Sequence, residues 1–497
     1  MSKLEENAYN LVKALEKAGF LAFFAGGYVR DKIIKRKTND IDIATDARPE
    51  EIKKVLTKNK VKFIEIGEAF GVIAAVIPKN KKENYTYEIA TFRQDFGVKD
   101  NRHPKNVKFL SDPKEDAVRR DFTINGMFMG LHDNCYIAKS LHCWNMGKQK
   151  QCNNATIKQC PILKKEKEGI VVDFVYGLQD INSRIIRFIG NPQDRIEEDA
   201  LRMMRAVRFA CQLGFEIEPE SLRAIEKNKG LIKEISEERI RDEITKILIS
   251  ERRREGIDLL EKIGLLHLII PELDKAKDTP QPKNMHFEGS VWNHTLLALE
   301  KCRTNDPIIN WAVLLHDVGK SFTFQSADET GDRIRFNGHD SEGAKIAATI
   351  LRRLKFSNEE VSTIEWMIKF HMLFSNLFKM REARRIMYLS DPRFPKLLEL
   401  FWVDANSSVR STPSGRVLPP ELSAYNRGKK FLEAHNNKPS LPKPLIRGNV
   451  VMKIMGITSG TKEVGEILKK VYDAQLEKKI RTKAEAKKMA EKLLKKK

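Results

Sequence analysis

The sequence predicts an α+β protein, in which a β-rich N-terminal part is followed by a long all-helical part. Four apolar or alternating segments near the N-terminus have the length and pattern of strands: 20–25, 39–45, 71–78 and 85–92. From about residue 194 onward, apolar residues recur with the helical period of about 3.6 residues. A mixed sheet with few flanking helices, followed by helices alone, accounts for both patterns.

Composition and charge indicate a polyanionic partner. The chain has 497 residues, a formal net charge of +22 and an isoelectric point near 9.5. Each Lys or Arg that neutralises a phosphate releases counterions, so we expect a nucleic acid as partner rather than a merely basic surface. No apolar run approaches the roughly 20 residues that span a bilayer, and the first ten residues lack the apolar core of a signal peptide. We therefore expect a cytoplasmic protein with no membrane partner.

One long segment interrupts the strand pattern. Residues 132–169 have no clear period and few aliphatic side chains, so we expect a loop or insertion there. Four of the six cysteines lie in it, at 135, 143, 152 and 160. Their spacing differs from the C-x-x-C of structural zinc sites, so we interpret them as incidental thiols.

Asp40 and Asp42 are the first candidate catalytic residues. They stand at i and i+2 on a predicted strand, so both carboxylates project from the same face. Two hard oxygen ligands close together suit a pair of Mg²⁺ ions, which clamp the attacking hydroxyl and the leaving pyrophosphate of a nucleotidyl transfer. Taken alone, such a pair is more often part of a solvated surface.

A glycine turn precedes these aspartates. Gly26 and Gly27 join a buried strand to a predicted helix, with Arg30 and Asp31 in its first turn. Glycines let the backbone approach phosphate oxygens, the helix N-terminus offers N–H donors, and an arginine fork matches a triphosphate. An ordinary strand–helix turn is the alternative interpretation.

The run GGYVRD at 26–31, followed by DIDIAT at 40–45, resembles the DNA polymerase beta nucleotidyltransferase superfamily. More narrowly, it resembles the class II tRNA nucleotidyltransferases and their bacterial poly(A) polymerase relatives, and the resemblance extends through nearly the whole chain outside 132–169. It implies a DNA polymerase beta-like head with Mg²⁺ held by Asp40 and Asp42. The activity it implies is template-independent addition of the 3′ CCA sequence to tRNA from CTP and ATP, with release of pyrophosphate.

The same resemblance assigns further residues of the head. Glu88, in YEIATFR, matches the position of a third catalytic acidic residue on a neighbouring strand, although an ordinary strand-surface glutamate fits almost as well. Arg120, Asp121 and Asn125, in RRDFTIN, match the motif that recognises the ribose, where they would bridge phosphate and the 2′-hydroxyl. A charged turn is the alternative for this run.

Asp199 and Arg202, in the run EEDALRMMRAVRF at 197–209, are three apart on a predicted helix and are therefore neighbours on one face. A carboxylate only accepts hydrogen bonds and a guanidinium only donates them, so the pair matches the amino donor and ring-nitrogen acceptor of cytosine and adenine. Uracil and guanine would leave unpaired groups, which cost about 1–3 kcal/mol each. The resemblance assigns this pair to base selection, whereas in isolation it would most often be a surface salt bridge. Arg205 and Arg208 continue along the same helix toward the triphosphate or primer.

Two segments bear on which member of this family the chain resembles. GEAFGVIAAV at 67–76 is similar to the GxxFG strand of tRNA nucleotidyltransferases, whereas bacterial poly(A) polymerases tend to carry an arginine-rich sequence there. The segment 91–109 retains the loop, including Arg102 and His103, that CC-adding enzymes shorten. Full CCA addition is therefore favoured. A-only addition stays open, because A-adding enzymes keep the same loop and helix.

A second constellation of His and Asp residues lies in the helical block at about 285–405. Its members stand at or near a predicted helix end or beside an apolar run: His294, His316, Asp317, His339, His371 and Asp404. The series resembles the HD phosphohydrolases, which implies one or two divalent metals, with Asp317 as a bridging ligand if two bind. A mixed His/Asp set suits a transition metal such as Mn²⁺, Ni²⁺ or Fe²⁺ better than Mg²⁺ alone. The activity implied is hydrolysis of 2′,3′-cyclic phosphates and similar esters, and a degenerate structural domain is the alternative.

These patterns divide the chain into four parts. We expect a head at 1–185, a helical neck for RNA binding and nucleotide selection at 186–270, an HD-like domain at 271–410 and a basic helical tail at 411–497. Within the tail, 445–480 resembles the segment that supports tRNA binding, and its Lys and Arg residues suit contacts with the RNA backbone. No feature of the sequence indicates an oligomeric state.

Two other classes of function are alternatives. One is a metal-dependent HD phosphohydrolase whose N-terminal part mainly binds RNA, and the other is a non-catalytic RNA-binding protein. Both are disfavoured, because a relic has no reason to keep both the pair Asp40 and Asp42 and the pair Asp199 and Arg202.

Overall fold

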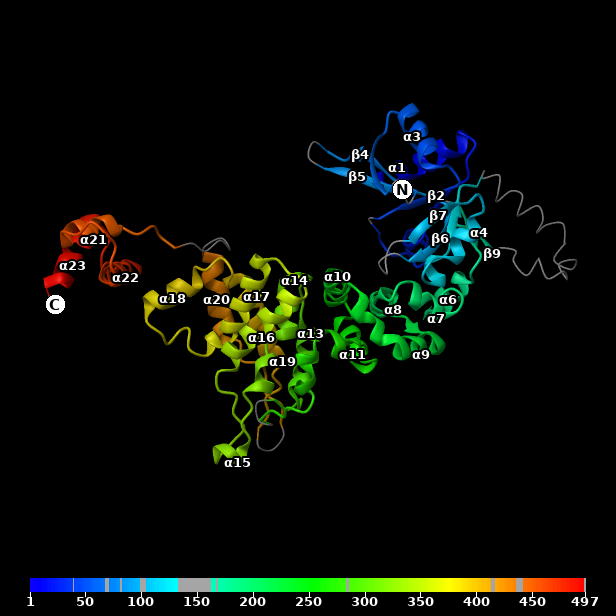
Figure 1. Cartoon of the computed structure of the whole chain (residues 1–497). Coiled ribbons are helices and arrows are strands. Elements are labelled where there is room, and N and C mark those ends of the chain that lie inside the picture. The colour runs from blue at the N-terminus through cyan, green and yellow to red at the C-terminus, as the bar shows by residue number, and fades with distance from the viewer. Residues whose placement is uncertain are drawn as a thin grey trace, which may run out of the picture. The chain divides into compact units, whose positions relative to one another are not determined.

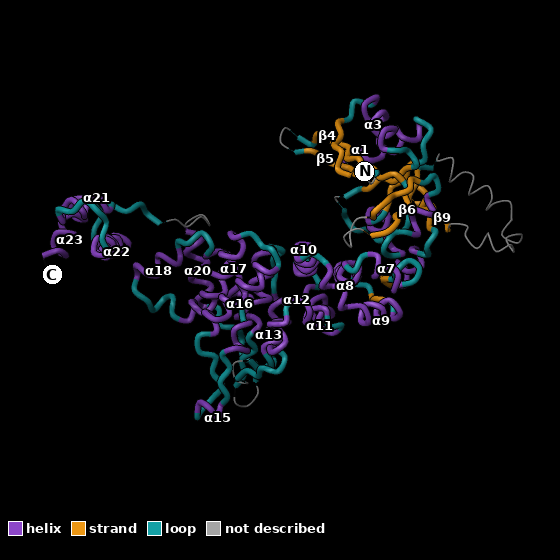
Figure 2. Tube along the Cα trace, in the orientation of Figure 1, coloured by secondary structure: helices purple, strands orange, loops and turns teal. Residues whose placement is uncertain are grey.

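The chain divides into two compact units. Figure 1 draws its helices and strands, coloured by residue number. The structure, a computed structural model, describes residues 1–38, 40–67, 71–80, 83–98, 104–132, 162–166, 169–282, 286–412, 416–434 and 441–495. Unit 1 comprises 1–247 with 259–268, and unit 2 comprises 248–258 with 269–497. Every strand of the described residues lies in unit 1, and unit 2 is built from helices and loops (Figure 2).

Unit 1 is organised around an eight-stranded mixed sheet in the order β3-β4-β5-β2-β1-β8-β10-β9. Its strands are β1 (Ala22–Ala25), β2 (Asp42–Thr45), β3 (Lys62–Gly67), β4 (Val72–Pro78), β5 (Asn84–Thr91), β8 (Phe128–Gly130), β9 (Ile162–Glu166) and β10 (Gly169–Asp173). Within this sheet β2 and β5 run parallel, and the other neighbours pair antiparallel. A separate hairpin is formed by β6 (Arg93–Val98) and β7 (Pro104–Phe109).

Helices cover the sheet and then continue the chain. α1 (Lys3–Lys17) and α3 (Pro49–Lys58) pack against each other and against one face of the sheet. Phe23, Phe92 and Phe128 form an aromatic core, with ring centroids about 6 Å apart. The other helices up to residue 269 are α2 (Gly27–Ile33), α4 (Pro113–Val118), η2 (Thr123–Asn125), α6 (Gly177–Ser183), α7 (Pro192–Glu198), α8 (Leu201–Leu213), α9 (Pro219–Asn228), η5 (Lys229–Glu234), α10 (Glu237–Leu248), α11 (Arg253–Lys262) and α12 (Leu265–Ile269). The first part of α11 belongs to unit 2.

Two expectations about this part are wrong in detail. Residues 162–166, expected in a loop, form the edge strand β9, because the buried apolar strand β10 needs a hydrogen-bonding partner on that side. The expected all-helical neck contains β12 (Glu216–Ile217), which pairs with β11 (Ile185–Ile186). Two residues are too few to give a sequence period. The four cysteines of the insertion, and Arg102 and His103, lie outside the described residues.

Unit 2 is helical. Its helices are η6 (Pro271–Ala276), α13 (Val291–Lys301), α14 (Pro307–Leu315), η7 (Val318–Phe322), α15 (Ala327–Thr330), α16 (His339–Arg353), α17 (Asn358–Phe370), η8 (His371–Ser375), α18 (Glu382–Leu389), α19 (Phe394–Ser407), α20 (Ser423–Ala434), α21 (Gly448–Met455), α22 (Lys462–Leu476) and α23 (Lys483–Lys495). The last three share a core of their own, which includes Val451, Ile467 and Val471. Across the described residues, no helix has the length and apolar character needed to cross a membrane.

A buried carboxylate fixes the end of β10. Asp173 is 1% exposed and accepts hydrogen bonds from the backbone N–H groups of Val175, Gly177 and Leu178 at 3.0, 3.1 and 2.9 Å. A Cβ at Gly177 would lie 2.3 Å from the carbonyl oxygen of Thr123, which is the first residue of η2. The D-x-x-x-G spacing therefore closes the turn into α6 and lets it pack directly on η2.

We expect Asp173→Ala to destabilise unit 1 by about 3 kcal/mol or more, because each of the three buried donors left without an acceptor costs about 1–3 kcal/mol. Thermal unfolding followed by circular dichroism measures this. Asp194→Ala, which removes an exposed carboxylate on α7, is the matched control and should change stability by less than about 0.5 kcal/mol. Equal melting temperatures for the two variants would contradict the assigned role of Asp173.

Candidate functional site

The turn between β1 and α2 forms one edge of the candidate site. β1 ends at Ala25, Gly26 has a φ of +64°, and α2 begins at Gly27. A Cβ at Gly26 would lie 3.2 Å from the Arg120 guanidinium and 3.7 Å from the Asp42 carboxylate. Glycine is therefore needed here both for the left-handed backbone and for the close approach of these two charged groups.

Three predicted acidic residues lie on or beside neighbouring strands. Asp42 is the first residue of β2 and pairs with Ala25, and Glu88 lies on the parallel neighbour β5. Asp40 precedes β2 and is not on the strand as expected, because β1 ends at the Ala25–Asp42 pair and offers the preceding residues no partner. Ile41, between the two aspartates, is buried, which is consistent with both carboxylates lying on the opposite side.

Mutual repulsion marks these carboxylates as a cation site. Burial, together with the negative charges of Asp40 and Glu88, raises the pKa of Asp42 to about 7, against the opposing charge of Arg120. A divalent cation would relieve this repulsion, and carboxylate oxygens are the ligands that Mg²⁺ prefers. The residues present therefore fit a magnesium site.

A cavity of about 760 Å³ adjoins the glycine turn and the aspartates. The predicted residues that line it are Gly26, Gly27, Arg30, Asp31, Asp40, Asp42, Arg120, Asp121, Asn125, Asp199, Arg202, Arg205 and Arg208. Of the site residues predicted in the head and neck, Glu88 does not line the cavity. The cavity is also lined by residues that the sequence reasoning missed: Tyr28, Arg36, Lys37, Thr38, Arg119, Phe209 and Gln212. Several guanidinium groups around one cavity suit a polyphosphate ligand.

A network of one partly buried ion pair and two side-chain hydrogen bonds spans this cavity wall. Nε of Arg205, on α8, donates to Asp121 at 2.9 Å, and Nδ2 of Asn125 donates to the same carboxylate at 3.1 Å. Although burial favours the neutral acid, the Arg205 charge and its hydrogen bond hold the pKa of Asp121 at about 2. Nη1 of Arg30 in turn donates to Oδ1 of Asn125 at 2.7 Å. Contacts therefore run continuously from α2 to α8.

Arg30 differs from its expected role as a free phosphate fork. Its side chain is buried, and besides the bond to Asn125 it forms an ion pair with Asp31 at 2.8 Å. Because Asp31 and Asn125 already contact the guanidinium, Arg30 links α2 to η2 within the cavity wall.

Asp199 and Arg202 both line the cavity, but they do not share a helix as expected. α7 ends at Glu198, the backbone of Asp199 is extended, and α8 begins at Leu201. The Asp199 carboxylate accepts a hydrogen bond from the backbone N–H of Leu201 at 3.1 Å. Such a side-chain bond to the first turn ends one helix and caps the next, which explains the break.

Hydrogen bonds with three neighbouring residues hold these two side chains. Nη2 of Arg239, on α10, donates to Asp199 at 2.9 Å. Nη1 of Arg202 donates to Glu198 at 2.7 Å and to the carbonyl oxygen of Arg195 at 2.9 Å. Arg239 was not predicted as part of the site, because in the sequence it is one arginine on an amphipathic helix about forty residues after Asp199.

A third contact joins α8 to the same helix. Nε of Arg208 donates to Glu243 at 2.6 Å, and Glu243 stands four residues after Arg239 on α10. Residues four apart lie on one helix face, so a single face of α10 holds both Asp199 and Arg208.

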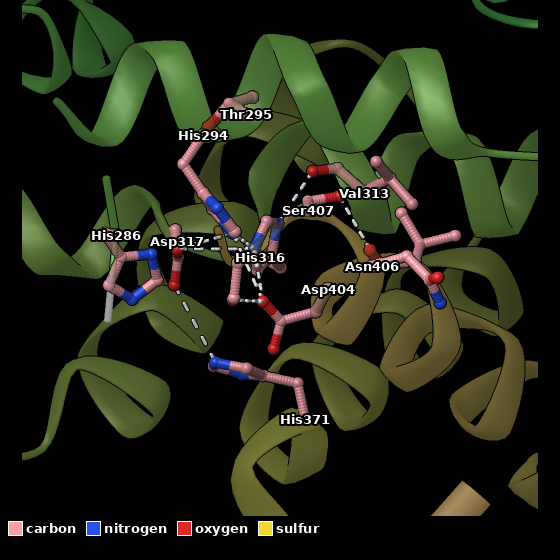
Figure 3. A network of polar contacts seen from close by, with 12 residues as sticks. His286, His294, Thr295, Val313, His316, Asp317, His371, Asp404, Asn406 and Ser407 are labelled. Carbon is pink, nitrogen blue, oxygen red and sulfur yellow. Dashed lines mark hydrogen bonds and ion pairs between the residues drawn. The ribbon is translucent and has the colours of Figure 1, made fainter. Parts of the chain in front are cut away.

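The second candidate centre lies in unit 2, where the six predicted His and Asp residues lie close together and all but the half-buried Asp404 are buried. Figure 3 shows His294, His316, Asp317, His371 and Asp404 at this centre. The Nε2 atoms of His294 and His316 lie 3.3 Å apart, and so do those of His339 and His371. The opposite nitrogen, Nδ1, of the last three rings lies within 2.8 Å of a backbone carbonyl oxygen. With Nδ1–H donated to a carbonyl, a neutral ring directs its Nε2 lone pair into the cluster.

Asp317 stands between the two pairs of imidazoles. Its Oδ2 lies 3.3 Å from His316, and its Oδ1 lies 3.8 Å from both His339 and His371. Within the described residues neither oxygen receives a hydrogen bond, although Nζ of Lys320 lies 2.7 Å from Oδ2. A buried carboxylate without hydrogen bonds, surrounded by imidazole nitrogens, fits a divalent cation on each side.

Side chains behind this cluster were missed by the sequence reasoning. Glu288 and His286 form a further group with His294, and Lys320 also binds Gln281 at 2.7 Å. Glu288 and His286 lie in the loop before α13, where no helical or strand period singles them out. The signal that was present is Lys320 following closely on the His316–Asp317 pair.

Comparison with protein families gives three successive matches along the chain. The poly A polymerase head domain matches residues 22–138, the probable RNA and SrmB-binding site of polymerase A matches 214–277, and the HD domain matches 290–391. The first match holds the glycine turn and the carboxylates, and the third holds most of the imidazole cluster.

The curated relatives are CCA-adding enzymes. The enzyme of Lactobacillus helveticus is 37% identical over 298 residues, which are 59% of this chain and 63% of that enzyme. The enzyme of Bacillus subtilis is 35% identical over 260 residues, which are 52% of this chain and 54% of that enzyme. The chain thus matches less than two thirds of the length of these relatives.

Solved structures of similar fold cover the chain from end to end. The CCA-adding enzyme of Bacillus stearothermophilus in complex with CTP has a TM-score of 0.69 at 22% identity, over 100% of this chain and 99% of that one. The Thermotoga maritima CCA-adding enzyme complexed with tRNA has a TM-score of 0.53 at 18% identity, over 99% and 96%. These likenesses confirm the predicted fold, a mixed-sheet head followed by helical parts with an HD domain. The chain therefore matches, in order, the poly A polymerase head domain, the probable RNA and SrmB-binding site of polymerase A and the HD domain, and it is similar to CCA-adding enzymes.

Proposed function

We propose that this chain adds the 3′ CCA sequence to tRNA from CTP and ATP, without a template and with release of pyrophosphate. One observation supports this above the others: a single basic cavity is lined both by the aspartates suited to Mg²⁺ and by an acceptor–donor pair suited to C and A. Its relatives of 35–37% identity are CCA-adding enzymes, and proteins of the same fold have been solved with CTP, with ATP and with tRNA.

In the proposed reaction the head supplies the metal-binding and phosphate-binding groups. Asp40, Asp42 and Glu88 hold Mg²⁺, which when bound stabilises the charge that develops on the transferring phosphate. The Gly26 turn lets the backbone approach the phosphates. Arg120, beside that turn, neutralises phosphate charge.

The ribose and the primer end are assigned to the ion-pair network. Asn125 and Asp121 supply an amide and a carboxylate that can bind a 2′-hydroxyl, and Arg205 keeps Asp121 ionised. Arg208 lies farther along α8 and is held by Glu243, so its charge is directed along the cavity wall toward the triphosphate.

Base selection is assigned to Asp199 and Arg202. A carboxylate has about four acceptor positions, and the bonds from Leu201 and Arg239 leave at least one for the amino group of cytosine or adenine. Both bonds of Arg202 use Nη1, which leaves Nη2 as the donor to a ring nitrogen. Because neighbours already fix both side chains, they cannot easily rotate to suit uracil or guanine.

The number of nucleotides added is tested with three tRNA transcripts that end at the discriminator base, after the first C and after the second C. Each is offered one labelled nucleotide at a time. We expect C to be added to the first two and A to the third. Addition of A to the third transcript alone would make the chain an A-adding enzyme, and long A tails on unrelated RNA would make it a poly(A) polymerase.

We propose a second activity for the HD domain, the hydrolysis of phosphoesters such as 2′,3′-cyclic phosphates. Asp317 would be one of the residues that hold one or two divalent transition-metal ions there, and it would be shared between the ions if two bind. The buried Asp317 carboxylate, whose one oppositely charged contact outside the imidazoles is Lys320, and the converging Nε2 atoms favour this over a purely structural domain. His294, His316, His339, His371 and Asp404 are the other proposed ligands. Such ions supply a Lewis acid and an activated water when bound.

Asp42→Asn is nearly isosteric and removes one metal-binding charge, so we expect nucleotide incorporation to fall by about a thousandfold or more, which corresponds to about 4 kcal/mol of transition-state stabilisation. Single-turnover incorporation of labelled CMP measures this. Asp46→Asn is the matched control: Asp46 follows the same strand, lies outside the cavity and accepts a hydrogen bond from Leu21. A variant at Asp42 that extends tRNA at the rate of the control would contradict the assignment.

Asp199→Asn places an amide, which both donates and accepts, where only an acceptor stood. We expect the preference for C over U and for A over G to fall by about 10- to 100-fold, as one mismatched hydrogen bond of about 1–3 kcal/mol requires. Competing incorporation from nucleotide mixtures measures the ratio. Asp194→Asn, on the neighbouring helix α7, should leave it unchanged, and unchanged selectivity in Asp199→Asn would remove the residue from base reading.

Asp317→Asn keeps the volume of the side chain and removes the bridging charge, so we expect Mn²⁺- or Co²⁺-dependent hydrolysis of bis(p-nitrophenyl) phosphate to be lost while CMP incorporation is retained. Chelation with EDTA followed by return of the ion should restore hydrolysis in the unmodified chain. Equal metal-dependent hydrolysis in the variant would place the activity elsewhere.

A further inference from the structure

His294 differs from the other three imidazoles in what holds its Nδ1 atom. In His316, His339 and His371 the Nδ1 atom lies 2.8, 2.8 and 2.6 Å from the carbonyl oxygen of the residue three positions earlier. His294 stands in the first turn of α13, and its Nδ1 lies 2.8 Å from Oε1 of Glu288 instead. A carboxylate from outside the helix therefore fixes this one ring.

The Glu288 carboxylate receives three donors. Oε1 lies 2.8 Å from Nδ1 of His286 as well as from His294, and Oε2 accepts from the backbone N–H of Val409 at 3.1 Å. The side chain is 7% exposed, so these bonds replace the water that its charge would otherwise need. They also tie the loop before α13 to the segment that follows Asp404 on α19.

The opposite nitrogen of the same ring reaches into the cluster, as Figure 3 shows. Nε2 of His294 lies 3.2 Å from Oδ1 of Asp404, 3.3 Å from Nε2 of His316 and 3.6 Å from Oδ2 of Asp317. A ring that donates Nδ1–H to a carboxylate keeps one tautomer, points Nε2 in one direction and becomes a stronger base.

We propose that Glu288 is a positioning residue for the metal centre of the HD domain: it fixes the orientation and the tautomer of His294, so that Nε2 serves as a ligand. The inference rests on the proposed metal centre. His286 holds the same carboxylate oxygen and so keeps Glu288 in place. In this proposal Glu288 and His286 would act through His294 and would not themselves be ligands.

A Co²⁺ titration of the full chain tests this, followed by calorimetry and by the visible absorption of the bound ion. An Asp42→Ala background keeps the head from contributing. Glu288→Gln retains the size of the side chain and an oxygen acceptor but removes the charge, and we expect the Kd for Co²⁺ to rise about 10- to 100-fold. Glu272→Gln is the matched control, because it breaks a carboxylate pair with Arg353 in the same unit. It should leave the Kd unchanged.

An unchanged Kd in Glu288→Gln, when His294→Ala weakens binding, would overturn the positioning role. Absence of Co²⁺ binding in the parent chain would overturn the metal centre itself, and the inference with it. Circular dichroism, and CMP incorporation by Glu288→Gln with Asp42 intact, verify that the variant is folded. If it does not fold, His286→Phe gives a second measure: it removes one donor from Glu288, and a Kd equal to that of the parent would equally count against the role.

Discussion

The partly buried ion pair between Asp121 and Arg205 is the interaction on which the proposed catalytic cavity depends. The ion pair joins Asp121, which follows α4, to α8. Hydrogen bonds of Asn125 to Asp121 and to Arg30 continue this chain of contacts to α2, beside the glycine turn. The Arg205 charge keeps Asp121 ionised, so loss of Arg205 would leave a partly buried carboxylate without its partner. The pair therefore fixes the distance between the groups that would bind the phosphates and the helix that would read the base.

The two candidate centres share a physical design although they lie in different units. In each, acceptor groups converge on one region: the Asp42 carboxylate is raised in pKa by its acidic neighbours, and the Asp317 carboxylate has no hydrogen bond in the described cluster. In each centre a further side chain contacts a proposed binding residue: Arg239 donates to Asp199, and Glu288 lies within hydrogen-bonding distance of His294. Such convergence is costly in an empty site, and a bound cation or nucleotide relieves it.

The amino-acid sequence was sufficient for the parts that have a local signature. The strand, the glycine turn and the helix at 20–34 follow from an apolar run, from the backbone freedom of glycine and from the helical period. The structure adds that Gly26, Gly27 and Arg30 line one cavity. The helical placement of Asp199 was wrong, because a side-chain cap to Leu201 overrides the continuous apolar period. Glu288 and Arg239 could not be predicted from local sequence patterns, because their contacts with His294 and Asp199 depend on the folded structure. The edge strand β9 was missed for a similar reason, since its only requirement is that β10 needs a partner.

The central claim is that the Asp199–Arg202 pair of the neck selects C and A for a nucleotidyl transfer at the proposed metal site of the head. Sequencing the 3′ ends of a tRNA that lacks CCA, after incubation with the full chain and all four nucleoside triphosphates at equal concentration, tests it most directly. The claim predicts tails of C, C and A in that order, with growth stopping there. Tails that contain U or G at the frequency of C or A, or tails of unlimited length, would contradict it.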